Sequence, residues 1–159
     1  MVFTENGYGQ SESELSFYRG KIVRIIVPTS PGGGSDGFAR LIAPHLQRYL
    51  TGSKVVVENI PGAGQLIAHN KLYDSRPDGL TIGTFNRALP FAPVIKLEGM
   101  KFDIMKYAWI GSTAVEATVF SIRSELPYKT IQDLMKSKQV IAMGCSGTGT
   151  SDYQFSLLL

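Results

Sequence analysis

Two glycine-rich loops carry the residues best suited to chemistry in this chain. They are residues 31–36 (PGGGSD) and residues 144–151 (GCSGTGTS), and each follows an apolar, β-branched run and precedes a helix-like pattern. Backbone N–H groups at the start of a helix, with no Cβ in the way, can bind a carboxylate or a phosphate. Two such loops predict a ligand held from two sides.

The first loop has alternative interpretations. It is not a Walker A motif, because no Gly-Lys-Ser/Thr sequence closes it. Gly32, Gly34 and Gly37 fit the Gly-x-Gly-x-x-Gly spacing of dinucleotide sites, and Glu58 follows at about the distance of the acidic residue. A tight turn needs fewer glycines than this loop has, so ligand contact is favoured over a simple turn. Glu58 can instead tie its own loop by accepting backbone N–H groups.

The second loop allows an enzyme hypothesis. Cys145 or Ser146 would be the nucleophile near a helix N-terminus, which lowers the pKa of a thiol. The Gly-x-Ser-x-Gly motif is incomplete, because Thr148 occupies the last glycine position. A hydrolase would need His45 or His69 within hydrogen-bond reach of that nucleophile. A small α/β enzyme, nucleotide-binding or hydrolytic, therefore remains the alternative function.

Composition excludes several other classes. The chain has 159 residues, 43% of them hydrophobic, and a net charge of +3 without clustered Lys or Arg, which gives no sign of nucleic-acid binding. The only cysteine and two well-separated histidines predict no disulfide, no metal site and no cofactor. No apolar stretch approaches the ~20 residues that span a membrane. Residues 1–19 are a polar lead-in without the apolar core of a signal peptide.

The elements around the first loop alternate between strand and helix. Residues 21–28, 54–58 and 80–85 read as strands, and residues 65–73 as a helix. Apolar residues recur at helical spacing after the first loop, with Ser35 or Asp36 as the N-cap. Pro44 should kink that helix or mark its boundary, and Thr51-Gly52 should end it. This alternation predicts a parallel α/β layer.

The rest of the chain shows a second, shorter set of elements. Residues 107–113, 118–122 and 139–143 read as strands. Residues 130–137 read as a helix with a capping box formed by Thr130 and Asp133. A helix pattern begins at Ser151 and stops at three leucines without a C-cap, which we interpret as a truncated chain; the alternative is a terminal helix docked on the core.

In their order along the chain, these motifs resemble the tripartite tricarboxylate transporter receptors, the Bug or TctC-like periplasmic solute-binding proteins. The resemblance covers Gly20 to the end of the chain. It rests on several segments: residues 26–28 (IVP), 31–36 (PGGGSD), 39–43 (ARLIA), 56–64 (VVENIPGAG), 77–81 (PDGLT), 83–84 (GT) and the second glycine loop with Ser151.

The resemblance implies a non-enzymatic, two-lobed α/β receptor of the type II periplasmic-binding-protein, or Venus-flytrap, fold. Its ligand would be a small organic carboxylate: a dicarboxylate or tricarboxylate, an acidic amino acid or an aromatic acid. It would be periplasmic and would deliver the ligand to membrane transporter subunits. By position, the ligand-binding residues carried over are Ser30, Gly32, Gly33, Gly34, Ser35, Asp36, Thr84, Phe85, Asn86, Arg87, Ser146, Gly147, Thr148, Gly149, Thr150 and Ser151.

The resemblance also implies a domain division. Residues 20–113 would form the first lobe, without a segment that returns to it near the C-terminus in the family, and residues 114–159 would begin the second lobe. We therefore expect a chain of this length to bind ligand more weakly than a complete receptor and to leave apolar surface bare, which favours association.

Overall fold

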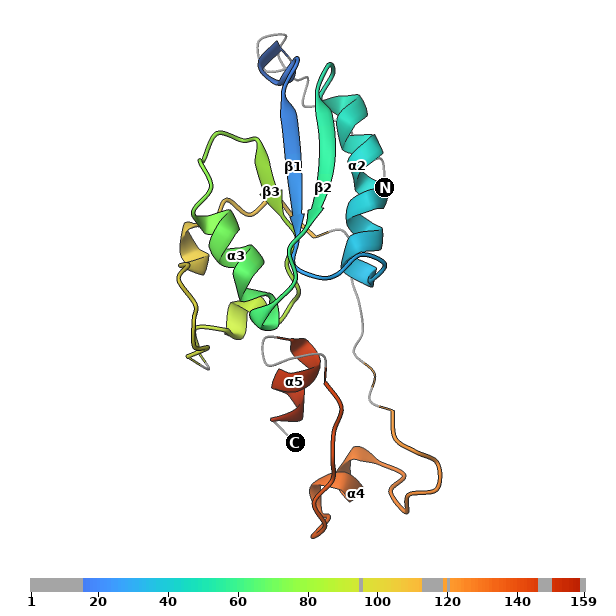
Figure 1. Ribbon diagram of the computed structural model, residues 1–159. Coiled ribbons are helices and arrows are strands. Elements are labelled where there is room, and N and C mark those ends of the chain that lie inside the picture. The colour runs from blue at the N-terminus through green and yellow to red at the C-terminus, as the bar shows by residue number, and fades with distance from the viewer. Residues whose placement is uncertain (1–15, 95, 113–118, 120, 146–149, 158–159) are drawn as a thin grey trace, which may run out of the picture.

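The structure is a computed structural model that describes residues 16–94, 96–112, 119, 121–145 and 150–157. Its regular elements lie mostly in the first half of the chain (Figure 1). The strands are β1 (Ile22–Val27), β2 (Lys54–Asn59) and β3 (Thr81–Gly83). The helices are α2 (Gly34–Tyr49), α3 (Leu66–Tyr73), α4 (Ile131–Met135) and α5 (Ser151–Ser156), with single 3-10 turns η1 (Ala63–Gln65), η2 (Leu89–Phe91) and η3 (Ile104–Lys106).

The three strands form one parallel sheet in the order β2-β1-β3. Ile25 in the central strand is paired with Val57 on one side and with Ile82 on the other. A central parallel strand is covered on both faces, which explains why β1 is an almost continuous run of β-branched residues. The three strands predicted from the sequence before residue 90 are confirmed, although β3 is shorter than expected.

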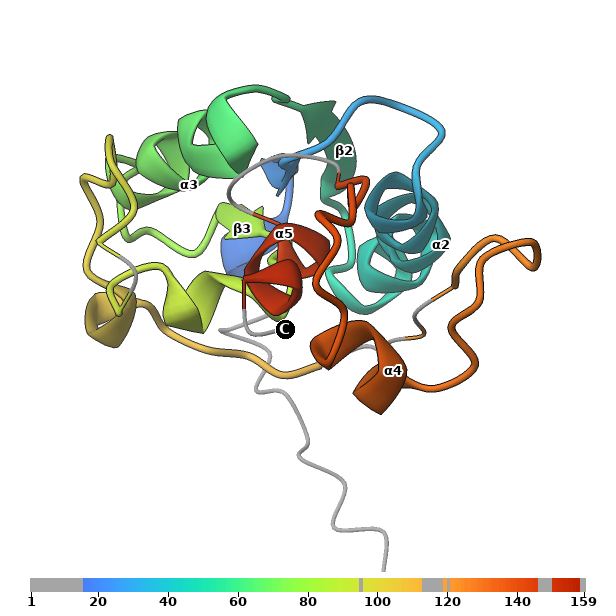
Figure 2. The same cartoon turned by 90° about the horizontal axis from the view of Figure 1, so that it is seen from below.

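The two main helices cover opposite faces of the sheet, as Figures 1 and 2 show. Ile25 and Val27 on β1 pack against Ala39 and Ala43 of α2, whose small side chains let the helix approach the sheet closely. Ile26, only 2% exposed, belongs to the other face because successive side chains of a strand alternate. The fold before residue 90 is therefore the parallel α/β layer that the sequence predicted.

The start of α2 differs from the prediction. Its N-cap is Gly33, with extended φ/ψ of −79° and 170°, and no side chain caps the helix. Ser35 and Asp36 lie within the first turn instead, so the prediction that one of them is the N-cap was wrong. The helix also continues through Pro44 to Tyr49, so Pro44 does not mark its boundary. Gly52, at a φ of 82°, lies in the turn that follows.

A second apolar cluster joins α3 to the residues after β3. Its buried members are Leu66, Leu89, Ala92 and Phe102. Asn70 fixes the loop behind this cluster, because its side chain donates to the carbonyl of Gly99 at 3.0 Å and accepts from the N–H of Lys101 at 3.0 Å. The described residues between 84 and 107 are thus packed onto α3 without forming strands.

The described residues after 107 contain helices but no strand. Of the predicted strand 107–113, residue 113 lies outside the described residues. Residues 107–112 and the predicted strand 139–143 pair with no strand among the described residues, and Val140 is fully exposed. Residues 119, 121 and 122 of the third predicted strand are not in a strand either, whereas 118 and 120 lie outside the described residues. The capping box is confirmed: Thr130 Oγ1 accepts from the N–H of Asp133 at 3.2 Å, and Asp133 Oδ2 accepts from the N–H of Thr130 at 2.8 Å.

Candidate functional site

The candidate site lies at the carboxyl ends of the three strands. After β1 the chain turns into α2, whereas after β3 it continues on the side of α3 (Figures 1 and 2). Open parallel sheets bind ligands at such a point, where the connections of two neighbouring strands diverge. Hydrogen bonds hold the loops together here, because Val27 O accepts from the N–H of Ile60 at 2.8 Å and Ile26 O accepts from the N–H of Thr84 at 3.0 Å. The sheet therefore brings three loops to one edge.

The first glycine loop presents bare backbone at the start of α2. Ser30 and the three glycines 32–34 are exposed. Gly34 has no positive φ, and a Cβ added there would meet no atom within 4 Å. The first N–H groups of a helix have no intrahelical partner, and no side chain caps those of α2. These N–H groups and the positive end of the helix dipole form an anion-binding surface.

Asp36 fastens this loop from behind. Its side chain is buried, and its Oδ2 accepts hydrogen bonds from the N–H of Gly32 at 2.9 Å and from Arg40 Nε at 3.0 Å. Its Oδ1 accepts from Asn59 Nδ2 at 2.9 Å. These donors, Arg40 first, lower the pKa of the Asp36 carboxyl to about 2. Asp36 is therefore an ionised carboxylate whose hydrogen bonds hold the loop.

Asn59 completes the network from the end of β2. Its amide nitrogen also donates to the carbonyl of Thr29 at 2.9 Å, and its Oδ1 accepts from an Arg40 terminal nitrogen at 3.0 Å. Three parts of the chain are thus joined: the loop after β1, the first turns of α2 and the end of β2. Asn59 was not among the residues expected at the site. The tying role was expected of Glu58, which forms an ion pair with Lys71 at 2.7 Å instead.

Two of the expected ligand residues, Gly32 and Asp36, already use polar groups within this network. The Gly32 N–H already donates to the Asp36 carboxylate. The φ of Gly32 is 89°, which favours glycine. The Asp36 carboxylate faces inward, and Arg40 balances its charge. An anion at this loop would therefore contact the free N–H groups next to Gly32 rather than the carboxylate.

The loop after β3 holds the next group of expected ligand residues. Thr84 is anchored to the end of β1, and Phe85 stacks on His69 with ring centroids 4.8 Å apart. Asn86 Oδ1 accepts from the N–H of Ala88 at 2.7 Å, and Asn86 Nδ2 donates to Gln65 Oε1 at 2.9 Å. Arg87 is exposed and interacts within the protein. The structure thus brings residues 84–87 to the same edge of the sheet as the first glycine loop.

His69 belongs to an aromatic cluster beneath this loop. Only 2% of the residue is exposed, and its ring lies against Phe85 and Phe102. Burial lowers the pKa of His69 to about 4, so the ring is neutral at pH 7. Tyr107 donates its hydroxyl to the His69 carbonyl at 3.0 Å, and burial raises the pKa of that hydroxyl above its usual range. His69 therefore occupies a packing position in this aromatic cluster.

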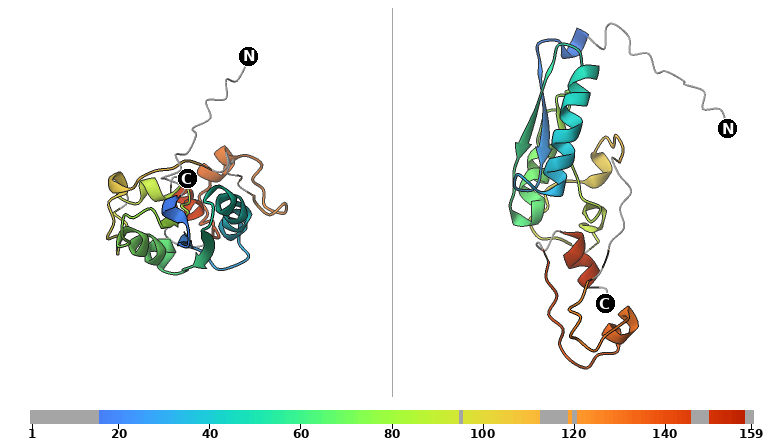
Figure 3. Two further views of the ribbon diagram at one scale, coloured as in Figure 1. Left: turned by 90° about the horizontal axis from the view of Figure 1, so that it is seen from above. Right: turned by 90° about the vertical axis from the view of Figure 1, so that its right-hand side faces the viewer.

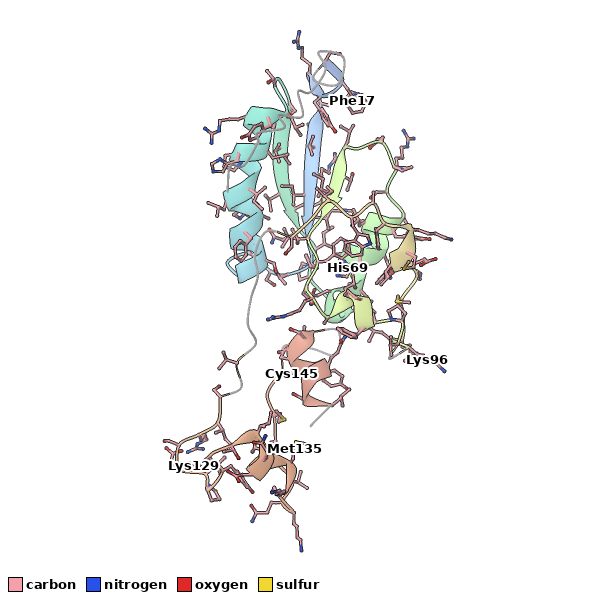
Figure 4. The ribbon with its side chains drawn as sticks, turned by 180° about the vertical axis from the view of Figure 1, so that it is seen from behind. Phe17, His69, Lys96, Lys129, Met135 and Cys145 are labelled. Carbon is pink, nitrogen blue, oxygen red and sulfur yellow. The ribbon has the colours of Figure 1, made fainter. Side chains whose placement is uncertain are left out.

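The hydrolase geometry is absent among the described residues. His45 lies on the exposed side of α2, with its Nδ1 2.6 Å from an Arg48 nitrogen. The Nε2 atom of His69 has no hydrogen-bond partner. Cys145 is exposed and lies beside α5, away from the His69 ring cluster (Figure 4). Neither histidine is therefore hydrogen-bonded to Cys145.

Only the ends of the second glycine loop are described. Ser146, Gly147, Thr148 and Gly149 lie outside the described residues. Thr150 is buried, and Ser151 is the first residue of α5. Two views agree that α5 lies between the carboxyl ends of the strands and α4 (Figures 1 and 3). The end of the second glycine loop thus lies at the carboxyl end of the sheet, as the first glycine loop does.

Among the residues that the structure describes, no group of three or more His, Cys, Asp or Glu side chains is placed to hold a metal ion. No helix there has the length and apolar composition needed to cross a membrane.

The comparisons with known proteins match this chain to a family of transporter receptors. Residues 38–155, well over half of the chain, match the family described as "Tripartite tricarboxylate transporter family receptor". The chain belongs to this family. The family assignment confirms the resemblance inferred from the motifs and argues against the enzyme alternative.

The curated relatives are longer proteins. A UPF0065 protein of Bordetella pertussis is 29% identical over 147 residues, which are 89% of this chain and 45% of the relative. A UPF0065 protein of Agrobacterium vitis is 32% identical over 83% of this chain and 39% of its own length, and BugT of B. pertussis is 30% identical over 77% and 30%. The chain therefore spans less than half the length of these relatives.

Two solved structures match part of this chain. The periplasmic binding protein BugD is 36% identical, with a TM-score of 0.45 over 48% of this chain and 25% of BugD. MatC from Rhodopseudomonas palustris, solved with bound malate, is 35% identical, with a TM-score of 0.38 over 40% of this chain and 21% of MatC.

Proposed function

We propose that this chain is part of a periplasmic solute-binding receptor of a tripartite tricarboxylate-type transporter and that it binds a small organic carboxylate. The observation that carries the proposal is the uncapped N-terminus of α2, which begins at Gly34 beside the diverging ends of β1 and β3. Family membership supports the receptor function.

The physical argument is that the site offers donors without competing negative charge. The N–H groups at the start of α2 and the helix dipole favour an anion. The only carboxylate within the first loop is that of Asp36, which is ion-paired with Arg40. Ser30 and Ser35 add hydroxyl groups of the kind that bind carboxylate oxygens, whereas the Thr84 hydroxyl already donates to the carbonyl of Ile26. In this proposal Asp36 positions the loop, and the exposed glycines and hydroxyls contact the ligand.

The proposal includes a second lobe. Residues 20–113 form the first lobe and residues 114–159 begin the second, and residues 146–151 clamp the ligand from the opposite side in a Venus-flytrap arrangement. The position of α5 on the carboxyl side of the sheet supports this arrangement. The candidate ligands are dicarboxylates and tricarboxylates, acidic amino acids and aromatic acids, which the receptor would pass to membrane transporter subunits.

Gly34 provides the test. Replacing it in Gly34→Val puts a branched side chain where the carboxylate is to approach, while the open space and ordinary φ at this position leave the fold intact. Gly37→Val is the matched control, because Gly37 is also helical and a Cβ there meets nothing within 4 Å. Isothermal calorimetry with citrate, malate and L-aspartate should show binding lost in Gly34→Val and retained in Gly37→Val. Equal affinity in both well-folded variants would contradict the proposal.

A further inference from the structure

The loop that follows β2 carries a conformation that glutamine rarely adopts. Gln65 has φ 79° and ψ −4°, in the left-handed region, and residues 62–64 before it also have positive φ values. Two of these four residues are not glycine, and such backbone is retained mainly where the surrounding structure requires it. Gln65 precedes α3 but does not cap it with its side chain.

The Gln65 side chain reaches across to the loop after β3 instead. Its Oε1 accepts from Asn86 Nδ2 at 2.9 Å, and both residues are half-buried. The loop of Gln65 is itself fixed at the carboxyl edge of the sheet, because the N–H of Ile60 donates to the carbonyl of Val27. A third loop thus adds a side chain to the edge where residues 30–36 and 84–87 lie.

The orientation of both amides follows from one backbone group. The N–H of Ala88 can only donate, so the atom of Asn86 that it contacts is the oxygen. The Asn86 nitrogen therefore faces Gln65, and the atom of Gln65 that receives it is the oxygen. Gln65 Nε2 is left with two donor hydrogens and no partner among the described residues, and Asn86 Nδ2 keeps one further hydrogen.

We infer that Gln65 is a ligand-specificity residue of the receptor site. It holds Asn86 in place, and the two side chains together present amide donors to a carboxylate oxygen. The inference rests on the proposed function. Each amide oxygen of the pair already accepts one hydrogen bond, whereas three amide hydrogens are unused among the described residues, so the pair favours an acceptor such as a carboxylate over a ligand that offers a donor there.

Two substitutions of Gln65 distinguish ligand recognition from a purely structural role. Gln65→Glu keeps an oxygen for Asn86 but replaces the free donor with a second acceptor that carries negative charge. Gln65→Gly removes the side chain and suits the left-handed backbone, so it should keep or raise the melting temperature. Gln47→Glu is the matched control, because Gln47 also accepts a hydrogen bond, from the N–H of Val55 at 2.9 Å, but lies at the other end of β2.

The test is an NMR titration of the 159-residue chain with citrate, malate and L-aspartate, which follows the side-chain amide signals of Gln65 and Asn86. We expect both signals to shift with at least one acid and its affinity to fall by about tenfold or more in Gln65→Glu, as for the loss of one hydrogen bond to a charged group. The control should keep the wild-type affinity, and Gln65→Gly should bind more weakly without melting earlier.

Other results would contradict the inference, and one of them would also contradict the proposed function. Wild-type affinity in Gln65→Glu, or a lower melting temperature with unchanged affinity in Gln65→Gly, would overturn the inference and leave the proposed function standing. A wild-type chain that binds none of the three acids would overturn the proposed function and this inference with it.

Discussion

Asn59 Nδ2 donates a 2.9 Å hydrogen bond to Asp36 Oδ1 and thereby links the end of β2 to the first turn of α2. The same amide nitrogen donates to the carbonyl of Thr29, and the other carboxylate oxygen accepts from the N–H of Gly32. The loop between these two backbone groups is thus held at both ends by side chains. Preorganised donors lose less conformational entropy when a ligand binds.

Asp36→Asn should loosen this loop. The amide that replaces the carboxylate has only one oxygen, so it cannot accept from both Gly32 and Asn59, and the ion pair with Arg40 is lost. We expect a lower melting temperature and faster hydrogen exchange at the Gly32 N–H, both measurable without ligand. The exposed Glu98 provides a control for the change in net charge. A variant Glu98→Gln that lowers the melting temperature as much as Asp36→Asn would contradict the assigned role.

The same carboxylate predicts an acid limit to stability. The pKa of Asp36 is lowered from 3.8 to about 2, so its contribution is complete above pH 3.8 and is lost as the pH falls toward 2. Unfolding by denaturant, followed at several pH values between 5 and 2, should show a decline in this window that is smaller in Asp36→Asn. An identical decline in both proteins would show that other groups cause it.

The sequence predicted the parts of the fold that depend on neighbouring residues. The capping box of Thr130 and Asp133 spans four residues, and it formed as predicted. The alternation of strand and helix before residue 90 was also correct. By contrast, residues 139–143 have the composition of a strand, but a strand needs a partner, and none lies beside them among the described residues. β-propensity largely reflects packing against neighbours, so it misled here.

The candidate site was predictable in position but not in detail. The glycines and the parallel strands indicated which loops would meet, and the spacing of Asp36 and Arg40 by four residues could have indicated their ion pair. The contact from Asn59 spans 23 residues and depends on strand register. The left-handed Gln65 gave no signal, because nothing in the sequence distinguishes it from a helical glutamine. The ligand contacts themselves stay a prediction.

His69 predicts a second acid-sensitive window at higher pH. Its pKa is lowered from 6.5 to about 4 by burial, so its contribution is complete above pH 6.5 and is lost as the pH falls toward 4. The shift corresponds to about 3 kcal/mol of the free energy of unfolding. His69→Phe should remove this dependence between pH 6.5 and 4, as measured by denaturant titrations. His45→Phe on the exposed side of α2 is the control, and it should keep the wild-type profile because His69 remains.

Gly83 is expected to be intolerant of even a methyl group. A Cβ there would contact Leu72 Cδ2 at less than van der Waals distance and would lie 3.3 Å from Leu72 Cγ, at the place where α3 packs on β3. Overpacking of this kind costs about 1–3 kcal/mol, so Gly83→Ala should lower the free energy of unfolding by that amount.

Gly37→Ala is the matched control for this prediction and should have the opposite sign. Gly37 lies within α2, and a Cβ there meets nothing within 4 Å, so alanine should stabilise the helix by about 0.5–1 kcal/mol. Leu72→Ala should couple to Gly83→Ala, because the smaller side chain makes room for the new methyl group. A double-mutant cycle by chemical denaturation measures this coupling. Strictly additive effects would mean that the methyl group at position 83 is accommodated without displacing Leu72.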